Sequence, residues 1–550
     1  MNADNSINLS ASSAKDYDSL TNTGNKVQDL TDLPNDLFLL ISSYLSPQDS
    51  VLCRRVSRAW FEAFTNADAS WNFMRWHFAR SREMRRAAEE LGEKPDWARI
   101  FAKVARRYYY LRSAKPRLTE KVDVIQEIAG NKGGPFRGVA PWSRWLQWND
   151  HVATFQHRDP TWCMDDGLLV YQEAISERYV AYDLETRLRF SIPFDGEDKT
   201  VRRLRLTCGV LIIEWCEREP YHQLNDRETV HRHFATAFDV RRQRSPSSEA
   251  QEFTWDITFR SEWKIHFLGL PLNSHDRFFS AHTSTHYALY LWQPNRSPWG
   301  EEDPLEQLTV WDISAPSSYR PSLDPTGANK PGSGAPGPVV VNRFTWRDLE
   351  FLGLRQRHTP SLRAVLLDDA NVYVHEEEHR WLAGQHSSLS PPRHHQVRCT
   401  GIPFSGVGPR WFDECGADGD VHMSFCPRAG SLARINDSTS RLLVPDGNGT
   451  WPGRAPCWRH EEFPYLTVSD VVDAGAGVRV VARQCFMVEA LSSFVLPKIS
   501  VEEDEDEDEQ PEIRFADDMW WELLGKGRIA GDERWVVGED RDGRVTIVRF

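Results

Sequence analysis

Apolar positions along the chain follow two different periods. From Leu30 to about Leu111 they recur every three or four residues, and Pro and Gly are rare. This spacing places them on one side of a helix. From about Trp142 to Phe550, short β-branched and aromatic runs alternate with Gly, Asp and Asn turns, which predicts strands. The sequence therefore predicts a multidomain chain with a small all-α part followed by a larger all-β part.

The first helical stretch, residues 30–60, predicts three short helices. Pro34 suits the first position of a helix, because an N–H at that position would have no helical partner anyway. Ser46 is expected to cap a second helix that begins at Pro47, and Ser57 a third. A module of about 45 residues buries little surface by itself, so we expect one apolar face to need a partner.

Apolar residues form stripes on all three predicted helices. On the first helix they step by four residues, with a second apolar face beside them. On the second helix they are expected to face inward, and on the third they are aromatic. The residues of the first helix are Leu33, Leu37, Ile41 and Leu45, with Phe38 and Leu40 on the second apolar face. Those of the second helix are Val51, Leu52 and Val56, and those of the third are Trp60, Phe61 and Phe64.

The spacing of these residues resembles the F-box family. The family pattern is Leu-Pro, an apolar residue every four positions, Asp, Val and Trp. Here it is met by Leu33-Pro34, Leu37, Ile41, Leu45, Asp49, Val56 and Trp60, and Trp71 falls where many members have another tryptophan. The resemblance covers residues 30–75 and implies docking on the Skp adaptor of Skp–cullin–F-box ubiquitin ligases. The adaptor contacts that it implies are Leu33, Pro34, Leu37, Ile41, Leu45, Val51, Leu52 and Val56.

Residues 76–141 are predicted to form a helical linker after the F-box. One amphipathic helix is expected there, with an apolar stripe from Trp97 to Leu111. Its other face is basic and could bind RNA or phosphate, with Tyr108–Tyr110 as stacking partners. We favour the alternative, a solvated face on a linker helix. The basic residues are Arg99, Lys103, Arg106 and Arg107.

Residues 142–550 predict an all-β domain built from repeated small sheets. Three or four short strands recur about every 50–60 residues, as in propeller blades, so we expect a β-propeller of six or seven blades. A generic β-sandwich, or a pair of them, is the alternative. Aromatic-Asp pairs that resemble the end of a WD repeat occur at Tyr182-Asp183, Phe238-Asp239 and Trp311-Asp312.

Three segments are expected to lie outside this core. Residues 1–29 are polar and predict a disordered tail, while 321–338 and 502–512 predict solvated loop insertions. By contrast, 545–550 are apolar to the end of the chain. We expect this last strand to join a sheet begun elsewhere in the chain, because that pairing removes an open edge.

Charge and cysteine usage indicate which binding partners and which cellular compartment to expect. The chain has 66 Lys and Arg against 80 Asp and Glu, a net charge of −14, with an acidic run at Glu502–Glu509. Broad, charge-driven binding of nucleic acid is therefore not expected. No stretch of about 20 apolar residues predicts a membrane span. The nine cysteines form no C-x-x-C pair and the N-terminus resembles no secretory signal, so a reduced cytoplasmic or nuclear protein is expected.

One stretch of the chain matches a catalytic motif. His375-Glu376-Glu377-Glu378-His379 satisfies H-E-x-x-H, which needs a helix to bring both histidines to one metal. The preceding Asn371–Val374 predicts a strand, on which the two histidines would lie about 13 Å apart. A charged turn is the preferred interpretation. We expect no metal, no cofactor and no catalytic residue in this chain.

Together these features predict a non-catalytic substrate receptor of a Skp–cullin–F-box ubiquitin ligase. The F-box would bind the Skp adaptor and, through it, a cullin. The β domain would recruit a protein substrate for ubiquitination and proteasomal degradation. One alternative is a Skp-bound scaffold or trafficking protein that acts without a cullin. Another is an enzyme or glycan binder built on the Trp-rich β domain, with its turnover controlled by the F-box.

Overall fold

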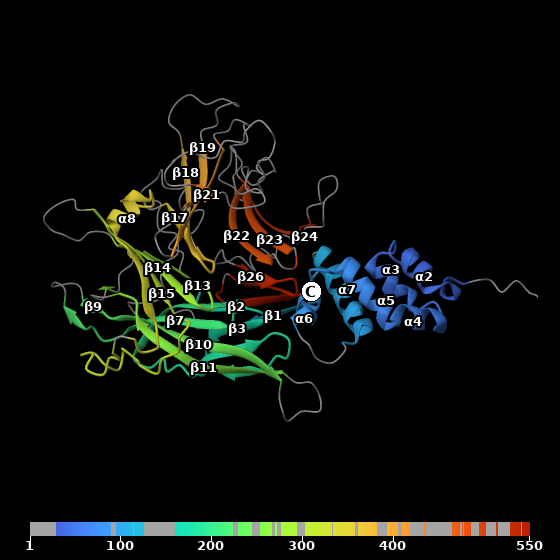
Figure 1. Ribbon diagram of the computed structural model, residues 1–550, viewed down its shortest axis with the longest axis horizontal. Helices are drawn as coiled ribbons and strands as arrows, with labels where there is room; N and C mark the ends of the chain where they lie inside the picture. The colour runs from blue at the N-terminus through green and yellow to red at the C-terminus, as the bar shows by residue number, and fades with distance from the viewer. Residues whose placement is uncertain are drawn as a thin grey trace, which may run out of the picture. The chain divides into compact units, whose positions relative to one another are not determined.

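The computed structural model divides the chain into two compact units, residues 1–113 and 114–550 (Figure 1). The predicted tail, apart from Asp29, and the predicted insertion 502–512 lie outside the residues that the structure describes. The described residues are 29–89, 95–113, 115–125, 160–223, 229–244, 253–266, 270–271, 277–293, 303–332, 334–357, 361–381, 393–404, 410–417, 434–435, 465–473, 476, 478–485, 494–501, 513–514, 529–540 and 542–550.

The first unit is helical throughout its described residues. A short 3-10 turn, η1, precedes a series of α-helices, and the predicted caps at Ser46 and Ser57 are both present. Pro34 is the N-cap of its helix and not its first residue. No helix among the described residues is long and apolar enough to cross a membrane. The elements are η1 (Leu30–Asp32), α2 (Asn35–Ser42), α3 (Pro47–Cys53), α4 (Arg58–Thr65), α5 (Ala67–His77), α6 (Arg82–Glu89) and α7 (Trp97–Arg112).

Helix α7 belongs to the helical unit, where it packs against α3, α4 and α5. Its predicted apolar residues Phe101, Val104 and Leu111 are buried. Six residues after the end of α7, the chain enters strand β1 (Leu118–Val122), which is part of the second unit. The segment 76–141, predicted as one helical linker, therefore divides between the two units.

The second unit consists mainly of antiparallel sheets that follow one another along the chain. We number them in chain order. The first sheet holds β2 (Trp162–Asp165), β3 (Leu168–Gln172), β4 (Tyr179–Asp183) and β5 (Arg189–Ser191); the second holds β6 (Lys199–Thr207), β7 (Val210–Glu217), β10 (His233–Arg244) and β11 (Phe253–Lys264); the third holds β13 (Arg277–His282), β14 (His286–Gln293), β15 (Leu305–Asp312) and β16 (Val339–Phe344).

The remaining sheets follow the same plan. A small helix, α8 (Trp346–Phe351), follows β16. A separate three-stranded sheet consists of β8 (His222–Gln223) and β9 (Thr229–His231), which lie between β7 and β10 in the sequence, and β12 (Leu270–Pro271), which follows β11. The fourth sheet holds β17 (Leu362–Leu367), β18 (Asn371–Trp381), β19 (Arg393–Pro403), β20 (Arg410–Ala417) and β21 (Arg434–Ile435); the fifth holds β22 (Tyr465–Asp473), β23 (Val478–Cys485), β24 (Phe494–Val501) and β25 (Ile513–Arg514); the sixth holds β26 (Ile529–Asp532), β27 (Trp535–Glu539), β28 (Val545–Arg549) and β1.

Apolar clusters fill the spaces between successive sheets. Separate clusters join the first sheet to the second, the second to the third, the third to the fourth, and the sixth to the first. Asp183, from the first aromatic-Asp pair, lies at one such interface. Its carboxylate caps the turn after β4 at the N–H of Glu185 and accepts the indole N–H of Trp255 on β11 at 2.8 Å. The pair therefore links the first two sheets.

The last strand of the chain closes the sixth sheet, as predicted. β28 lies between β27 and β1, and its residues Val545–Arg549 pair with β1 in continuous antiparallel register. Val545 and Val548 are completely buried. The final residues thus complete a sheet whose outer strand lies more than four hundred positions earlier in the sequence.

Residues 321–338 form a mainly exposed loop, as expected, but its start is held in place. Ser317 donates its backbone N–H to the carbonyl of Arg260 on β11, and Ser322 donates to the carboxylate of Glu262 at 3.0 Å. Asp324 then organises a turn by accepting the N–H groups of Ala328 and Asn329. Residues 317–322 are therefore held against β11 of the second sheet, and we call them the strap. The loop is solvated only beyond the strap.

Candidate functional site

The interior of the helical unit is a stack of aromatic rings from four helices. Phe38 on α2 contacts Phe64 on α4, with ring centroids 5.0 Å apart, and Phe64 contacts Phe73 on α5 at 5.8 Å. Phe73 in turn lies 5.4 Å from Phe101 on α7. All four side chains are buried. Helix α7, which lies outside the three predicted helices, thus contributes Phe101 to the same buried interior.

Hydrogen bonds fix the start of this module. Asp29 caps η1 and also accepts the indole N–H of Trp60 at 2.8 Å. The Ser46 hydroxyl accepts the Asp49 N–H at 3.1 Å, which sets where α3 begins. These bonds satisfy donors at helix starts that have no helical partner.

A buried ion pair ties α6 to α7. Arg107 donates two hydrogen bonds to the Glu83 carboxylate, at 2.8 and 2.9 Å. Burial by itself raises the pKa of Glu83, but the hydrogen bonds and the positive charge of Arg107 outweigh it, so this pKa lies below its ordinary value. Arg107 was predicted on the solvated basic face, and this is wrong. Arg99, Lys103 and Arg106 are exposed.

The opposite side of the module presents an apolar surface to solvent. Tyr44 is 84% exposed and Val56 62% exposed, which is unusual for large apolar side chains. The exposure follows from the geometry of α2, because Phe38 takes the inward position and its neighbours project outward. We call this surface the apolar face; it comprises Leu37, Leu40, Ile41, Tyr44, Leu52 and Val56.

The predicted adaptor contacts fall on or beside the apolar face. Leu52 and Val56 had been expected to face inward from α3, which is wrong, because both are exposed. Sequence reasoning missed Tyr44 as a contact candidate and placed Leu40 only on a second apolar face. Leu40 lies three residues after Leu37 on α2, and Tyr44 lies three residues after Ile41, just beyond the end of α2; that spacing could have identified them. Of the predicted contacts, Pro34, Leu37, Ile41, Leu52 and Val56 are exposed, and Leu33, Leu45 and Val51 are half-buried.

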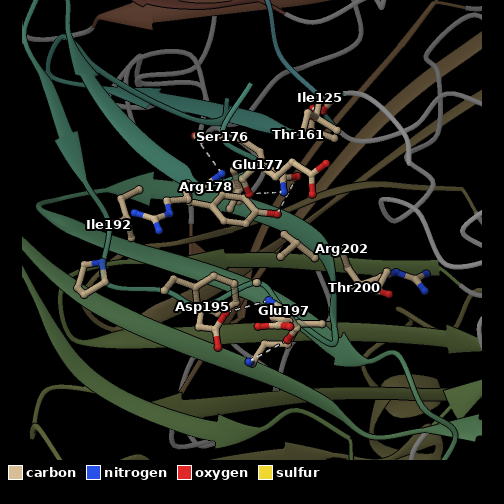
Figure 2. A pocket seen from close by; sticks show the side chains of 18 of the residues that line it. Ile125, Thr161, Ser176, Glu177, Arg178, Ile192, Asp195, Glu197, Thr200 and Arg202 are labelled. Carbon is tan, nitrogen blue, oxygen red and sulfur yellow. Dashed lines mark hydrogen bonds between the residues drawn. The ribbon is translucent and has the colours of Figure 1, made fainter. Parts of the chain in front are cut away.

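The β unit contains a polar cavity of about 770 Å³ between its first and second sheets (Figure 2). This volume lies within the range of about 300–1,000 Å³ typical of ligand sites. Figure 2 shows Glu177 and Arg178 on the turn between β3 and β4, and Thr200 and Arg202 on β6, around the same hollow. The sequence did not identify it, because its walls come from separate loops and strands.

Buried polar groups line the deeper part of this cavity. Thr200 is 3% exposed, and its hydroxyl has no hydrogen-bond partner within the described part of the chain. Arg203 is buried on the same strand, but it is engaged by the Phe278 carbonyl at 2.7 Å and by Glu214 at 3.3 Å. Burial raises the pKa of the nearby Cys216 thiol to about 11, so this cysteine stays protonated at neutral pH. These walls can bind polar ligands.

The H-E-x-x-H residues lie on strand β18 and form no helix. His375 and His379 are therefore separated along an extended backbone. His375 has its Nε2 3.3 Å from Cys399 Sγ on the neighbouring β19. The expected turn at residues 375–379 is absent, because β18 continues in register with β19 as far as Trp381.

Comparison with known proteins identifies the helical module. A family model described as F-box-like matches residues 30–74, from η1 into α5. No curated protein matches the chain. The matched segment includes both the capped helices and the whole apolar face, and F-box domains in general bind Skp-type adaptors. Residues 30–74 are therefore an F-box-like domain.

Proposed function

We propose that this protein is the substrate receptor of a Skp–cullin–F-box ubiquitin ligase. The observation that carries the proposal is the apolar face on an F-box-like domain, since F-box domains bind Skp-type adaptors. The β unit supplies a second, much larger body that can hold another protein. The receptor would act in the cytoplasm or the nucleus, and its substrate would be degraded by the proteasome.

The apolar face is suited to an adaptor in its chemistry. Burying a large apolar side chain that is exposed in the free protein contributes about 1.5–3 kcal/mol. Several such side chains are exposed on α2 and α3 and just after each helix, and interface energy is commonly concentrated in a few central residues. Leu40 and Ile41 on α2, with Tyr44 just after it, are the expected centre of the contact.

We further propose that the sheets of the β unit form a six-bladed propeller. Four interfaces between neighbouring sheets have apolar clusters, and β22 of the fifth sheet lies beside β26 of the sixth. In Figure 1, β2, β13, β17, β22 and β26, each from a different sheet, are grouped toward the middle of this unit. The pairing of β1 with β28 would lock such a ring, because it joins the two ends of the β region within one blade.

In this proposal the chain acts by position and not by chemistry of its own. Holding a substrate beside the ubiquitin-transferring subunits raises its effective concentration there. The polar cavity between the first two sheets is the first place to look for substrate contact, through exposed residues such as Arg178 and Arg218.

Two other functions remain as distinct proposals. A scaffold or trafficking protein would bind the adaptor through the same apolar face and never assemble with a cullin. An enzyme or glycan binder would instead use the cavity, because its size suits a small ligand. Cullin in the purified complex supports the ligase, whereas adaptor without cullin supports the scaffold. Binding in a glycan array would support the third.

The deciding experiment is a pull-down of adaptor and cullin with a Leu33→Ala, Pro34→Ala double variant and a Leu40→Asp, Ile41→Asp double variant. We expect both to lose about a hundredfold in adaptor affinity, or roughly 2.7 kcal/mol. Tyr109→Ala is the matched control, because Tyr109 is an exposed aromatic residue on α7, outside the apolar face. Undiminished adaptor binding by the Asp variant would overturn the proposal.

A further inference from the structure

Strand β16 leaves an apolar edge of the third sheet uncovered. It is the terminal strand of its sheet and pairs only with β15. Val339, Val340 and Val341 are 58%, 41% and 43% exposed. Within the described chain, no other segment pairs its backbone with this edge. The Asn342 side chain donates to the Phe404 carbonyl at 2.9 Å, and the Arg343 N–H donates to the Asn342 side chain.

Two other described edge strands, β11 and β1, show features that oppose pairing with another strand. The edge of β11 is covered by the strap, where Ser317 bonds to the Arg260 carbonyl. The edge strand β1 carries Glu120 and Lys121, and charged side chains on an edge discourage pairing with other strands. Strand β16 instead begins with three consecutive valines, and its one charged residue, Arg343, lies near its end. A row of unpaired backbone groups with β-branched side chains is a template for another strand.

The apolar surface continues onto the helix that follows. Trp346 is 44% exposed and Phe351 81% exposed on α8, which packs against β15 and β16. Exposed apolar side chains on adjacent elements favour an interaction surface, although Arg347 and Arg355 lie over the Trp346 ring. A bulge at Val341 interrupts the register with β15, so a pairing strand would be short.

The charged side chains around these apolar residues indicate whether the partner segment is acidic or basic. Arg343 and Arg347 are exposed and make no ion pair with a carboxylate in the described part of the chain. The carboxylates on α8 are engaged: Asp348 accepts hydrogen bonds from Thr345, and Glu350 pairs with arginines that follow the helix. The Arg343 and Arg347 guanidinium groups are therefore not neutralised by a carboxylate among the described residues, and Arg347 lies over the Trp346 ring at 5.2 Å.

From these observations we infer that β16 accepts a short extended segment of a partner protein, in which aliphatic residues alternate with acidic ones. The segment would add as an antiparallel or parallel strand to the third sheet. Its aliphatic side chains would cover the valines, and its carboxylates would meet Arg343 and Arg347. This interaction surface is separate from the apolar face of the F-box-like domain and does not depend on the ligase role.

The test uses the full chain in complex with its Skp adaptor and fluorescent octapeptides. One peptide alternates aspartate with valine, a second alternates lysine with valine, and a third has the first sequence with alternate backbone nitrogens methylated. We expect the acidic alternating peptide to bind at least about tenfold more tightly than the other two, because it alone offers both carboxylates and a free strand edge. Hydrogen exchange should slow at the amides of residues 339–344 and not at those of β11.

Variants of the protein locate the contact. Arg343→Glu should weaken the acidic peptide by about tenfold and improve binding of the lysine peptide. Arg241→Glu is the matched control, an exposed arginine on β10 of the second sheet. Equal binding of the methylated peptide would overturn strand addition, and an unchanged affinity in Arg343→Glu would overturn the site. Sedimentation that reveals a dimer broken by Arg343→Glu would also overturn it, because a second copy would then occupy the edge.

Discussion

The rings of Phe38 and Phe64 lie 5.0 Å apart and meet edge to face at 74°. Phe38 is 5% exposed, while Leu37 and Leu40 on the same helix are 47% and 56% exposed. One helix, α2, therefore supplies both a core residue and part of the apolar face. A substitution at Phe38 should therefore lower the stability of the helical unit, whereas a substitution at Leu37 or Leu40 should weaken adaptor binding.

Phe38→Ala is expected to destabilise the helical unit by about 3–5 kcal/mol, because it leaves a cavity between α2 and α4. Leu40→Ala should change the free energy of unfolding by less than about 0.5 kcal/mol, since Leu40 is largely in solvent. Thermal unfolding of the full chain, followed by helical circular dichroism, measures both. Equal destabilisation by the two substitutions would contradict the assignment of faces.

Truncation after Gly543 should destabilise the whole β unit. It removes β28, whose buried Val545 and Val548 pack inside the sixth sheet, and it leaves β1 and β27 with unpaired edges. We expect rapid proteolysis and a lower Tm for the β unit. An equally long deletion from the N-terminus is the control. Protease resistance like that of the intact protein would rule out a closing role for β28.

His282 should make the β unit sensitive to moderate acid. Burial, together with the nearby positive charges of Arg205 and Arg260, lowers the pKa of His282 to about 4, and its Nδ1 lies 3.1 Å from the Thr283 carbonyl. The unfolded chain takes up a proton near pH 6.5, where the folded protein does not. Stability is therefore retained above about pH 6.5 and falls by on the order of 3 kcal/mol toward pH 4.

The measurement is denaturant unfolding across this pH range, with His282→Gln as the variant. Its stability should fall less steeply with acid than that of the parent, whatever its value at neutral pH. The slope should not vanish, because burial also lowers the pKa of His233. Identical slopes in the two proteins would mean that His282 titrates normally.

Replacing residues 325–336 by a short Gly/Ser linker should lower the Tm by only a few degrees, because this part of the loop is exposed. Glu262→Ala should cost more, about 1–3 kcal/mol, because it leaves the Ser322 N–H and the buried Thr236 hydroxyl without that carboxylate. Calorimetry of both variants provides the comparison. A loop replacement that costs more than Glu262→Ala would show that the distal loop is structural.

Local patterns predicted the parts of the fold that depend on neighbours in sequence. The caps at Ser46 and Ser57 could be recognised because a capping side chain bonds N–H groups two or three residues away. The strands β7 and β14 could be recognised because a run of β-branched and aromatic residues between turns has few other solutions. The apolar spacing of α2 likewise pointed to the F-box-like domain before the fold was known.

The direction in which apolar residues face did not follow from those patterns. Leu52 and Val56 were expected inside, yet both are exposed, although α7 packs against α3. Arg107 was expected outside, yet Glu83 on α6 holds it in the interior. A periodicity identifies the two faces of a helix but not which of them a distant helix will cover.

By itself, the sequence determined the order of helices and strands, the position of the F-box-like domain and the apolar last strand, since each depends on contacts within a few residues. Only the tertiary structure decided that β28 pairs with β1, that the strap covers β11 while β16 stays open, and that a cavity forms between the first two sheets. These features join residues far apart in the chain. Their energies come from burial and hydrogen bonds that exist only once the sheets have assembled.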